Sequence, residues 1–277
     1  MRLLRRASVI LLTSILGFLA LLTGCQSKLI YFPRPYGPDD VTKWDTEPGT
    51  TVIKYATTAG KQQAYLLSPT PKPERLWLVV GGNGTLALDW SDWLREYGPK
   101  KDAWLLIDMP GYGACEGSPR PATIRRNLQA VVPAAMASLK WSLPADQPKL
   151  RFFGHSLGSA VCLMAAEEYD IRRGVMLAPF TSSMQMTKAM FGVDLGFLVW
   201  HRFDNRTRLK ELEKRGNAEV FILHGSDDEA IPVTMSRQLA KEFPGVVRYT
   251  EIPGGRHNTI QDMAPEAIHA AMEKARE

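Results

Sequence analysis

One serine of this chain stands in a pattern that would make it a nucleophile. Ser156 lies in the pentapeptide Gly-His-Ser-Leu-Gly at 154–158, between the apolar run 150–153 and a helical pattern. A strand, a sharp turn and a helix form a nucleophile elbow when small residues two places before and after the serine let the two backbones approach closely. The turn would aim the N–H groups of the helix N-terminus at a developing negative charge. The flanking strand and helix favour this interpretation over a glycine-rich corner without chemistry.

His257 is placed to serve as the general base. It lies in the glycine-rich loop 254–258, directly after the apolar run 246–252. The imidazole would accept the serine proton during attack on a carbonyl. We expect structural roles for the other four histidines, with the one inside the elbow facing away from the base; they are His155, His201, His224 and His269.

The acid that would orient this imidazole belongs on the turn after the apolar run 220–223. Asp227, Asp228 and Glu229 are adjacent there. Each carries a carboxylate that could stabilise the imidazolium formed during reaction. The residues alone leave the three candidates open, with a solvated acidic turn as the alternative.

Backbone amides would have to bind the oxyanion of a tetrahedral intermediate. The stretch Gly-Gly-Asn-Gly at 81–84 follows the apolar run 76–80, and its glycines allow an N–H group to point at such an oxygen. The partner donor would be the amide of Leu157, the residue after the serine. An ordinary glycine turn is the alternative for 81–84.

Eight strand-length segments organise these loops. Apart from a hairpin around 58–61, they are near-continuous apolar runs that alternate with helical patterns, which predicts an α/β fold with a mostly parallel, eight-stranded sheet covered by helices on both faces. Reactive groups of such sheets collect at the carboxyl ends of the strands. The expected strands are 51–56, 63–68, 76–80, 103–107, 150–153, 175–178, 220–223 and 246–252.

The length, composition and charge of the chain limit the classes of protein to which it can belong. The chain has 277 residues, 45% of them hydrophobic, which is enough for one sizeable core, and no internal repeat is visible. The formal charge is +5, and it falls to +2 without residues 1–24, which hold three arginines and no acidic residue. This balance gives no basis for nucleic acid as a partner.

The N-terminus predicts export and lipidation. Residues 1–24 combine a basic start with the apolar run 7–22, and Leu-Thr-Gly-Cys at 22–25 resembles the lipobox of bacterial lipoproteins. The resemblance implies cleavage before Cys25, a diacylglycerol thioether on its sulfur and acylation of the new N-terminus, with an uncleaved anchor helix as the alternative. Several acyl chains suffice for stable membrane anchoring. Gln26 favours the periplasmic face of the outer membrane if the host is Gram-negative.

The rest of the chain divides into a stem and one domain. Residues 25–49 form the lipidated stem, in which the apolar Leu-Ile-Tyr-Phe at 29–32 is expected to pack on the domain rather than touch the membrane. Residues 50–277 form the domain, with a cap insertion at 180–210. Cys115 and Cys162 are the thiols left after Cys25; a disulfide between them stays open, although Cys162 fits the buried face of the helix after the serine.

Taken together, these motifs resemble the serine hydrolases of the α/β-hydrolase superfamily over residues 50–275. The closest likeness is to membrane-associated esterases and acyl-thioesterases with a His-Gly-Asn oxyanion loop, a Gly-Tyr-Gly loop and a Leu-Ile-Tyr-Phe-Pro-like segment near the start. The family pattern His-Gly-x-x-Asp-x-x-x-Pro matches 224–232 and implies Asp228 as the acid, beside Ser156 and His257. The resemblance also implies Asn83 and Leu157 as the oxyanion donors. One departure is Gly81, which stands where the family has a histidine that braces the loop.

The resemblance and the residues together imply an esterase or thioesterase. Ser156 would attack the carbonyl of a small-molecule acyl ester or thioester, and water would release the acyl-enzyme without a metal or cofactor. Methionines and aromatics at 180–203 suit an apolar acyl chain, or the apolar face of a cap helix. A peptidase-like hydrolase and a non-catalytic envelope lipoprotein are the alternatives, and the sequence does not indicate the oligomeric state.

Overall fold

The computed structural model describes Gly17 and residues 26–277. The predicted signal peptide and Cys25 lie outside the described residues, apart from Gly17. Among the residues that are described, no helix is long and apolar enough to cross a membrane.

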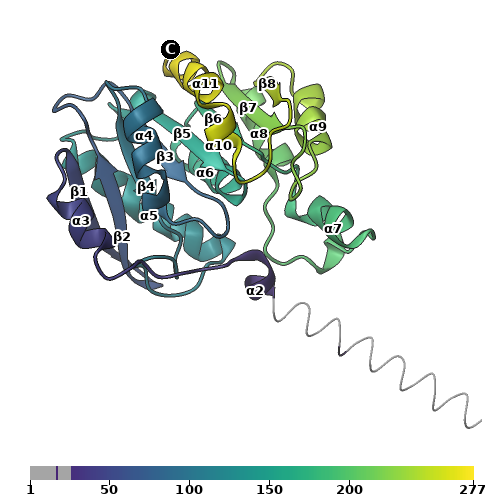
Figure 1. Ribbon diagram of the computed structural model, residues 1–277, viewed down its shortest axis with the longest axis horizontal. Helices are drawn as coiled ribbons and strands as arrows, with labels where there is room; N and C mark the ends of the chain where they lie inside the picture. The colour runs from purple at the N-terminus through teal and green to yellow at the C-terminus, as the bar shows by residue number, and fades with distance from the viewer. Residues whose placement is uncertain (1–16, 18–25) are drawn as a thin grey trace, which may run out of the picture.

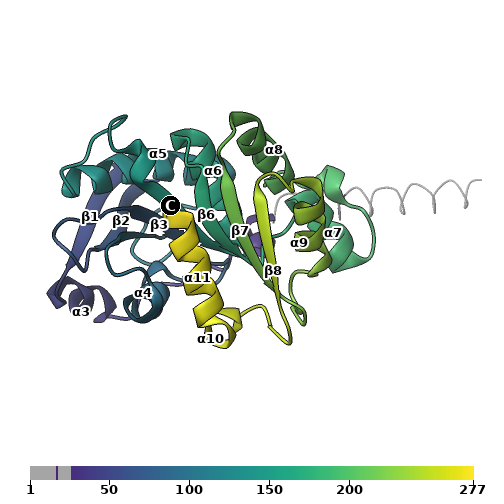
Figure 2. The ribbon, with the colours of Figure 1, turned by 90° about the horizontal axis from the view of Figure 1, so that it is seen from above.

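An eight-stranded sheet forms the centre of the domain, in the order β1-β2-β4-β3-β5-β6-β7-β8 (Figures 1 and 2). The first two strands form an antiparallel hairpin, β2 also pairs antiparallel with β4, and all other neighbours are parallel. The predicted sheet is therefore confirmed. The strands are β1 Thr50–Thr57, β2 Gly60–Leu67, β3 Leu76–Val80, β4 Ala103–Ile107, β5 Leu150–His155, β6 Arg173–Leu177, β7 Glu219–Gly225 and β8 Val247–Ile252.

Helices cover both faces of the sheet, as its doubly apolar strands require. One face packs against α5, α6, α8 and α9, and the other packs against α3, α4 and α11 (Figure 2). The alternation within β3 shows the division, because Leu78 belongs to the first core and Trp77 to the second. The helices are α3 Asp40–Thr46, α4 Ser91–Tyr97, α5 Pro121–Ser138, α6 Leu157–Tyr169, α8 Asn205–Arg215, α9 Thr234–Glu242, α10 Ile260–Met263 and α11 Pro265–Arg276.

Two segments lie outside these layers at one end of the molecule (Figure 1). The stem begins with α2, Gln26–Ile30, and the segment after β6 contains α7, Ser183–Phe191, and the short helix η3, Gly196–Leu198. A bridge between Ser182 and Asp204 closes this second segment, which we call the cap. The cap thus ends before the predicted boundary at 210, because Asp204 caps α8 and α8 packs on the sheet with α6.

Both thiols of the described chain are free and buried. Cys162 lies on the covered face of α6, as expected, and burial raises the pKa of Cys115 to about 12. These cysteines are packing residues, since a protonated, buried thiol is unreactive.

Candidate active site

Ser156 lies on a sharp turn between β5 and α6. Its backbone has φ 55° and ψ −122°, a combination that is strained for a residue with a side chain. The two glycines of the pentapeptide allow this turn: a Cβ at Gly158 would lie 2.0 Å from the carbonyl oxygen of Val80, and one at Gly154 would lie 2.6 Å from Cα of Ser159. The local geometry is that of the predicted elbow.

A chain of hydrogen bonds joins the three residues predicted for catalysis. Ser156 Oγ lies 3.0 Å from His257 Nε2, and His257 Nδ1 lies 2.7 Å from Asp228 Oδ2. Because the carboxylate can only accept, Nδ1 carries the proton and Nε2 is free to accept the one on Ser156. Ser156 and His257 are each only 7% exposed. The three side chains come from loops at the carboxyl ends of β5, β7 and β8.

The structure separates the three candidate acids. Asp228 Oδ1 accepts from the amides of Ala230 and Ile231, at 2.8 and 2.7 Å, which leaves Oδ2 for His257. Burial raises the pKa of the Asp228 carboxyl, but hydrogen bonds from His224, His257 and Ile231 outweigh burial and hold the pKa well below its usual range. Asp228 is therefore ionised at neutral pH.

The neighbouring acids have other partners. Asp227 is exposed, and its carboxylate accepts from the hydroxyl of Ser226 at 2.7 Å. Glu229 is also exposed, and it accepts from the backbone amide of His257 at 3.3 Å instead of from the imidazole. Neither carboxylate can substitute for Asp228 without a change in the turn.

The acid turn and the histidine loop fit together through two glycines. A Cβ at Gly225 would lie 2.0 Å from the carbonyl oxygen of Gly255, so only glycine allows this approach. The amide of Asp227 donates to the same carbonyl at 3.0 Å. The distance between Asp228 and His257 is thus fixed by backbone contact.

His224 also reaches Asp228, although we expected only a structural role for it. Its Nε2 lies 3.0 Å from Asp228 Oδ2 and 3.0 Å from the carbonyl oxygen of Ile231, while its Nδ1 lies 2.7 Å from Ser236 Oγ. The ring is fully buried. The i, i+4 spacing of His224 and Asp228 in the family pattern was the signal for this contact. His224 touches no reacting atom, so it positions the carboxylate.

The expectation for His155 was wrong. We expected its side chain to face away from the base, but His155 Nε2 lies 2.9 Å from the carbonyl oxygen of His257, and the two rings are 4.9 Å apart. Burial first, and then the neighbouring His257, lower the pKa of His155 to about 4. At neutral pH His155 is an uncharged donor that holds the backbone of the base.

The loop predicted to bind the oxyanion is adjacent to the serine. A Cβ at Gly82 would lie 3.5 Å from Cβ of Ser156. Among the hydrogen bonds of the described residues, neither the amide of Asn83 nor that of Leu157 donates to a protein acceptor. Both N–H groups are therefore available to a substrate oxygen.

Residues other than a histidine at position 81 brace this loop. A side chain at Gly81 would meet Thr85 and Trp90 at 2.9 to 3.0 Å. Instead, the carbonyl oxygen of Asn83 accepts from the hydroxyl of Tyr112 at 2.6 Å and from the amide of Phe32 at 3.0 Å. The side-chain amide of Asn83 donates to the carbonyl oxygen of Ile30 at 3.1 Å. The stem thus replaces the missing histidine as the brace.

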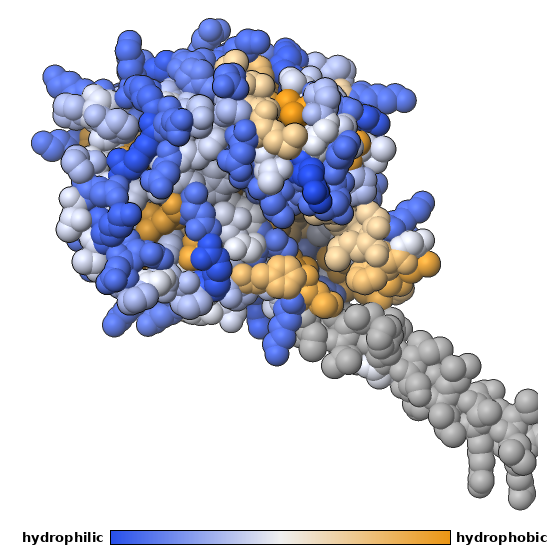
Figure 3. Space-filling model, in the orientation of Figure 1, coloured by the Kyte–Doolittle hydropathy of each residue, from blue (hydrophilic) through white to orange (hydrophobic). Residues whose placement is uncertain are grey.

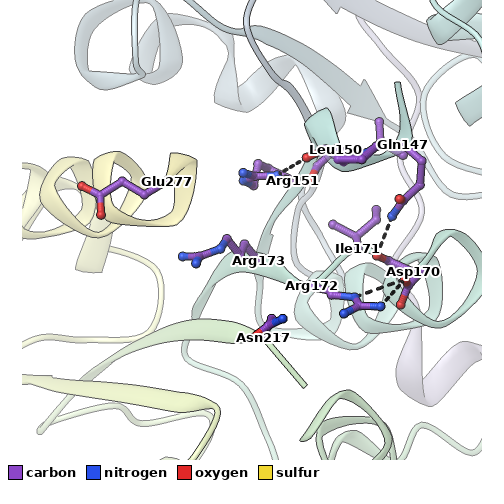
Figure 4. A pocket seen from close by; sticks show the side chains of 10 residues that line it. Gln147, Leu150, Arg151, Asp170, Ile171, Arg172, Arg173, Asn217 and Glu277 are labelled. Atoms are coloured by element: carbon purple, nitrogen blue, oxygen red, sulfur yellow. Dashed lines mark hydrogen bonds and ion pairs between the residues drawn. The ribbon is translucent and has the colours of Figure 1, made fainter. Parts of the chain in front are cut away.

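A pocket of about 400 Å³ lies at the opposite end of the sheet, where β5 and β6 begin (Figure 4). It contains three arginines, but each is already paired. Arg172 bonds to Asp170 and Arg173 to Glu219, and Arg151 donates to backbone carbonyls. The pocket offers no unpaired guanidinium for an anion.

The chain belongs to the alpha/beta hydrolase family, whose model matches residues 77–218. An uncharacterized protein of Mycobacterium tuberculosis is 28% identical over 155 residues, which cover 56% of this chain and 52% of that protein. The human alpha/beta hydrolase domain-containing protein 17B is 25% identical over 158 residues, covering 56% and 50%. The chain thus spans about half the length of the curated relatives it matches.

Solved structures share the fold. An alpha-beta hydrolase of Vibrio vulnificus has a TM-score of 0.65 at 18% identity, covering 86% of this chain and 88% of that one. A Pyrococcus furiosus esterase has a TM-score of 0.63 at 14% identity, covering 90% and 98%. The predicted α/β-hydrolase fold is confirmed, and the family supports hydrolase activity.

Proposed function

We propose that this protein is a serine hydrolase that cleaves carboxylic esters or thioesters with an apolar acyl part. The observation that carries the proposal is the hydrogen-bond chain from Ser156 through His257 to Asp228, which begins on a strained turn beside two available amides. Activation of a serine needs a base within hydrogen-bond reach and a third group that orients the base. The chain supplies both.

The mechanism follows from the proton positions. His257 Nε2 takes the Ser156 proton as Oγ attacks the acyl carbonyl, and Asp228 stabilises the resulting imidazolium. The amides of Asn83 and Leu157 bind the oxyanion, and His257 then returns the proton to the leaving alcohol or thiol. Water, activated by the same histidine, attacks the acyl-enzyme and releases the acid. Loss of one oxyanion donor would raise the barrier by roughly 2.7 to 4 kcal/mol.

An ester or thioester substrate fits both the relatives and the surroundings of the site. The structures of similar fold include the Pyrococcus furiosus esterase and Est1E of Butyrivibrio proteoclasticus with bound ferulic acid. The cap, which the stem joins to the loop of Asn83, supplies half-buried methionines, Met184 and Met186, which adapt to alkyl chains. These features support an apolar acyl group.

We also propose that Cys25 is lipidated and holds the enzyme at a bacterial envelope membrane. The support is the basic and apolar sequence before Leu-Thr-Gly-Cys at 22–25. Mass spectrometry of the purified chain tests this directly, because cleavage and acylation change the mass of the N-terminal peptide. An unmodified Met1 peptide would contradict the lipoprotein proposal while leaving the hydrolase proposal intact.

Hydrolysis of p-nitrophenyl esters of increasing chain length by the full chain in detergent tests the proposed chemistry. We expect Ser156→Ala to lose at least ~10³-fold in kcat/KM and Asp228→Asn to lose about 10⁴-fold in kcat, because the amide favours the wrong imidazole tautomer. Asp227→Asn is the matched control and should retain activity. A phosphonate probe should label Ser156 in the unmodified chain and in Asp227→Asn, and it should not label Ser156→Ala. The absence of both turnover and labelling in folded protein would refute the proposed enzyme activity.

A further inference from the structure

Large apolar side chains gather on the stem and the cap and face solvent. We call this set the stem–cap surface; its members are 49% to 74% exposed, and Figure 3 shows hydrophobic residues concentrated at this end of the molecule. Exposed apolar clusters of this kind mark contact surfaces. Its residues are Leu29, Phe32, Met190, Phe191, Phe197 and Trp200. The expectation that 29–32 packs on the domain therefore holds for Tyr31, which is 2% exposed, and is wrong for the side chains of Leu29 and Phe32.

Stem and cap form one surface because hydrogen bonds join them. The side-chain amide of Gln26 donates to the carbonyl oxygen of Leu198, and its Oε1 accepts from the amide of Trp200 at 2.8 Å. The hydroxyl of Tyr31, a side chain only 2% exposed, lies 3.2 Å from His201 Nδ1. Residues far apart in sequence therefore share a fixed orientation.

The same stem residues hold the proposed oxyanion loop. The backbones of Ile30 and Phe32 bond to Asn83, while the side chain of Phe32 is 54% exposed. Gly82, next to Asn83, approaches Ser156. Only a few residues thus separate the stem–cap surface from the serine.

The position of the anchor and the local charge both indicate a bilayer as the occupant. The proposed lipidation site, Cys25, directly precedes Gln26, which is itself bonded to the cap. Lys28, Lys188 and Arg202 are exposed within residues 26–32 and 183–203, which together hold one acidic residue, Asp194. Aromatic and aliphatic side chains in segments that also carry basic residues are typical of interfacial segments that contact anionic lipids.

We propose that the stem–cap surface lies on an anionic bilayer and directs the site of Ser156 toward acyl esters carried by membrane lipids. The substrate half of this inference rests on the proposed hydrolase function. The contact half rests on the proposed lipidation of Cys25 and on the exposed apolar and basic side chains, and it does not depend on hydrolysis. The lipid anchor alone would leave the domain free to rotate, whereas a second contact at the cap fixes its orientation.

Fluorescence quenching tests the contact. The full chain with Ser156→Ala, which removes turnover, is reconstituted in phosphatidylethanolamine–phosphatidylglycerol vesicles whose acyl chains carry bromine. The contribution of Trp200 is the difference from the same chain with Trp200→Phe. We expect more than half of that contribution to be quenched, because Trp200 would lie at the acyl boundary. The contribution of Trp141, obtained with Trp141→Phe, is the control and should persist.

Unquenched Trp200 fluorescence would overturn the proposal. If sedimentation then showed a dimer that dissociates in Trp200→Ser, the surface would be an interface between two copies of the chain. Because these measurements use an inactive variant, they can fail while ester hydrolysis holds, or succeed while hydrolysis fails.

Kinetics test the substrate half. We expect Phe197→Ser/Trp200→Ser to lose about tenfold in kcat/KM on a long-chain ester embedded in the vesicles and less than about twofold on soluble p-nitrophenyl butyrate. The matched control is Leu143→Ser/Met263→Ser, whose side chains are 41% and 49% exposed elsewhere. Equal losses on both esters in the first variant would overturn the inference.

Discussion

Both ends of the sheet bury charged side chains, but the hydrogen bonds of these side chains lead to different groups. At one end they lead to backbone carbonyls and at the other to a serine hydroxyl. At the amino end, Arg151 is 6% exposed and donates to the carbonyl oxygens of Pro148, Leu150 and Arg276, at 2.8 Å each. At the carboxyl end, the bonds from Asp228 pass through His257 and finish on the hydroxyl of Ser156. Burial and charge alone would mark either end as a site.

The difference teaches how to separate a reactive cluster from a structural one. The guanidinium of Arg151 donates to backbone carbonyls, one of which belongs to Arg276 at the end of α11. These hydrogen bonds hold the last helix against the sheet. Ser156 instead ends its chain beside two available amides. A site is recognised by a hydrogen-bond chain that terminates on a group able to react.

The largest expected effect in this comparison concerns stability at the amino end. Arg151→Met should lower the free energy of unfolding by about 2 to 4 kcal/mol, because several buried carbonyls lose a charged donor. We expect kcat per folded molecule to stay unchanged. Chemical denaturation followed by circular dichroism measures the first quantity and ester hydrolysis the second.

Arg173→Met is the control for this prediction. Arg173 pairs with Glu219 at 3.0 Å, but its side chain is 29% exposed, so we expect a cost of at most about 1 kcal/mol. Equal losses from the two variants would mean that the carbonyl contacts of Arg151 add nothing beyond a surface ion pair.

A smaller effect is expected at the carboxyl end when the pH falls. His155 has a pKa of about 4 in the folded chain, against 6.5 ordinarily, so the unfolded chain binds the proton first. The contribution of His155 is complete above pH 6.5 and is lost as the pH falls toward 4. Between pH 7 and 5 the free energy of unfolding should drop by about 2 kcal/mol from this group.

His155→Gln isolates that contribution. The amide cannot titrate in this range, so the difference in unfolding free energy between pH 7 and 5 should shrink by about 2 kcal/mol relative to the unmodified chain. An unchanged pH dependence would show that His155 is not the group responsible.

The smallest effect belongs to His224. His224→Leu removes a donor from Asp228, and we expect about a tenfold loss in kcat/KM with a partial recovery in His224→Gln, which retains an N–H group. The pKa of Asp228 should rise without this donor, so the acid side of the pH–rate profile should move to higher pH. A profile that keeps its shape would assign His224 to packing alone.

Much of the fold could be predicted because the parallel strands are buried on both faces. The apolar runs 76–80 and 103–107 coincide with β3 and β4. The pattern failed where burial alternates: β2 begins at Gly60, before the expected 63, because its first residues are polar and partly exposed. The strand β6 ends at Leu177, since Ala178 has φ 46° and leaves the strand conformation.

The sequence predicted those parts of the site that depend on the types of the side chains. The residues proposed as nucleophile and base could be identified from their loops, while the choice of Asp228 needed the family pattern. The brace on Asn83 could not be predicted, because Ile30 and Phe32 act through their backbones. The contact of His155 could not be predicted either. Its side chain bonds to a carbonyl about a hundred residues away in sequence, and the local sequence pattern does not determine which way the turn points that side chain.

The path of the stem limits where a recombinant version of this protein can be cut. A chain started at Thr50, the first residue of β1, would keep the whole sheet and the residues 156, 228 and 257. It would lose the bonds from Ile30 and Phe32 to Asn83 and those from Gln26 to the cap. Such a truncation would fold around an unsupported loop, so expression boundaries should retain Gln26.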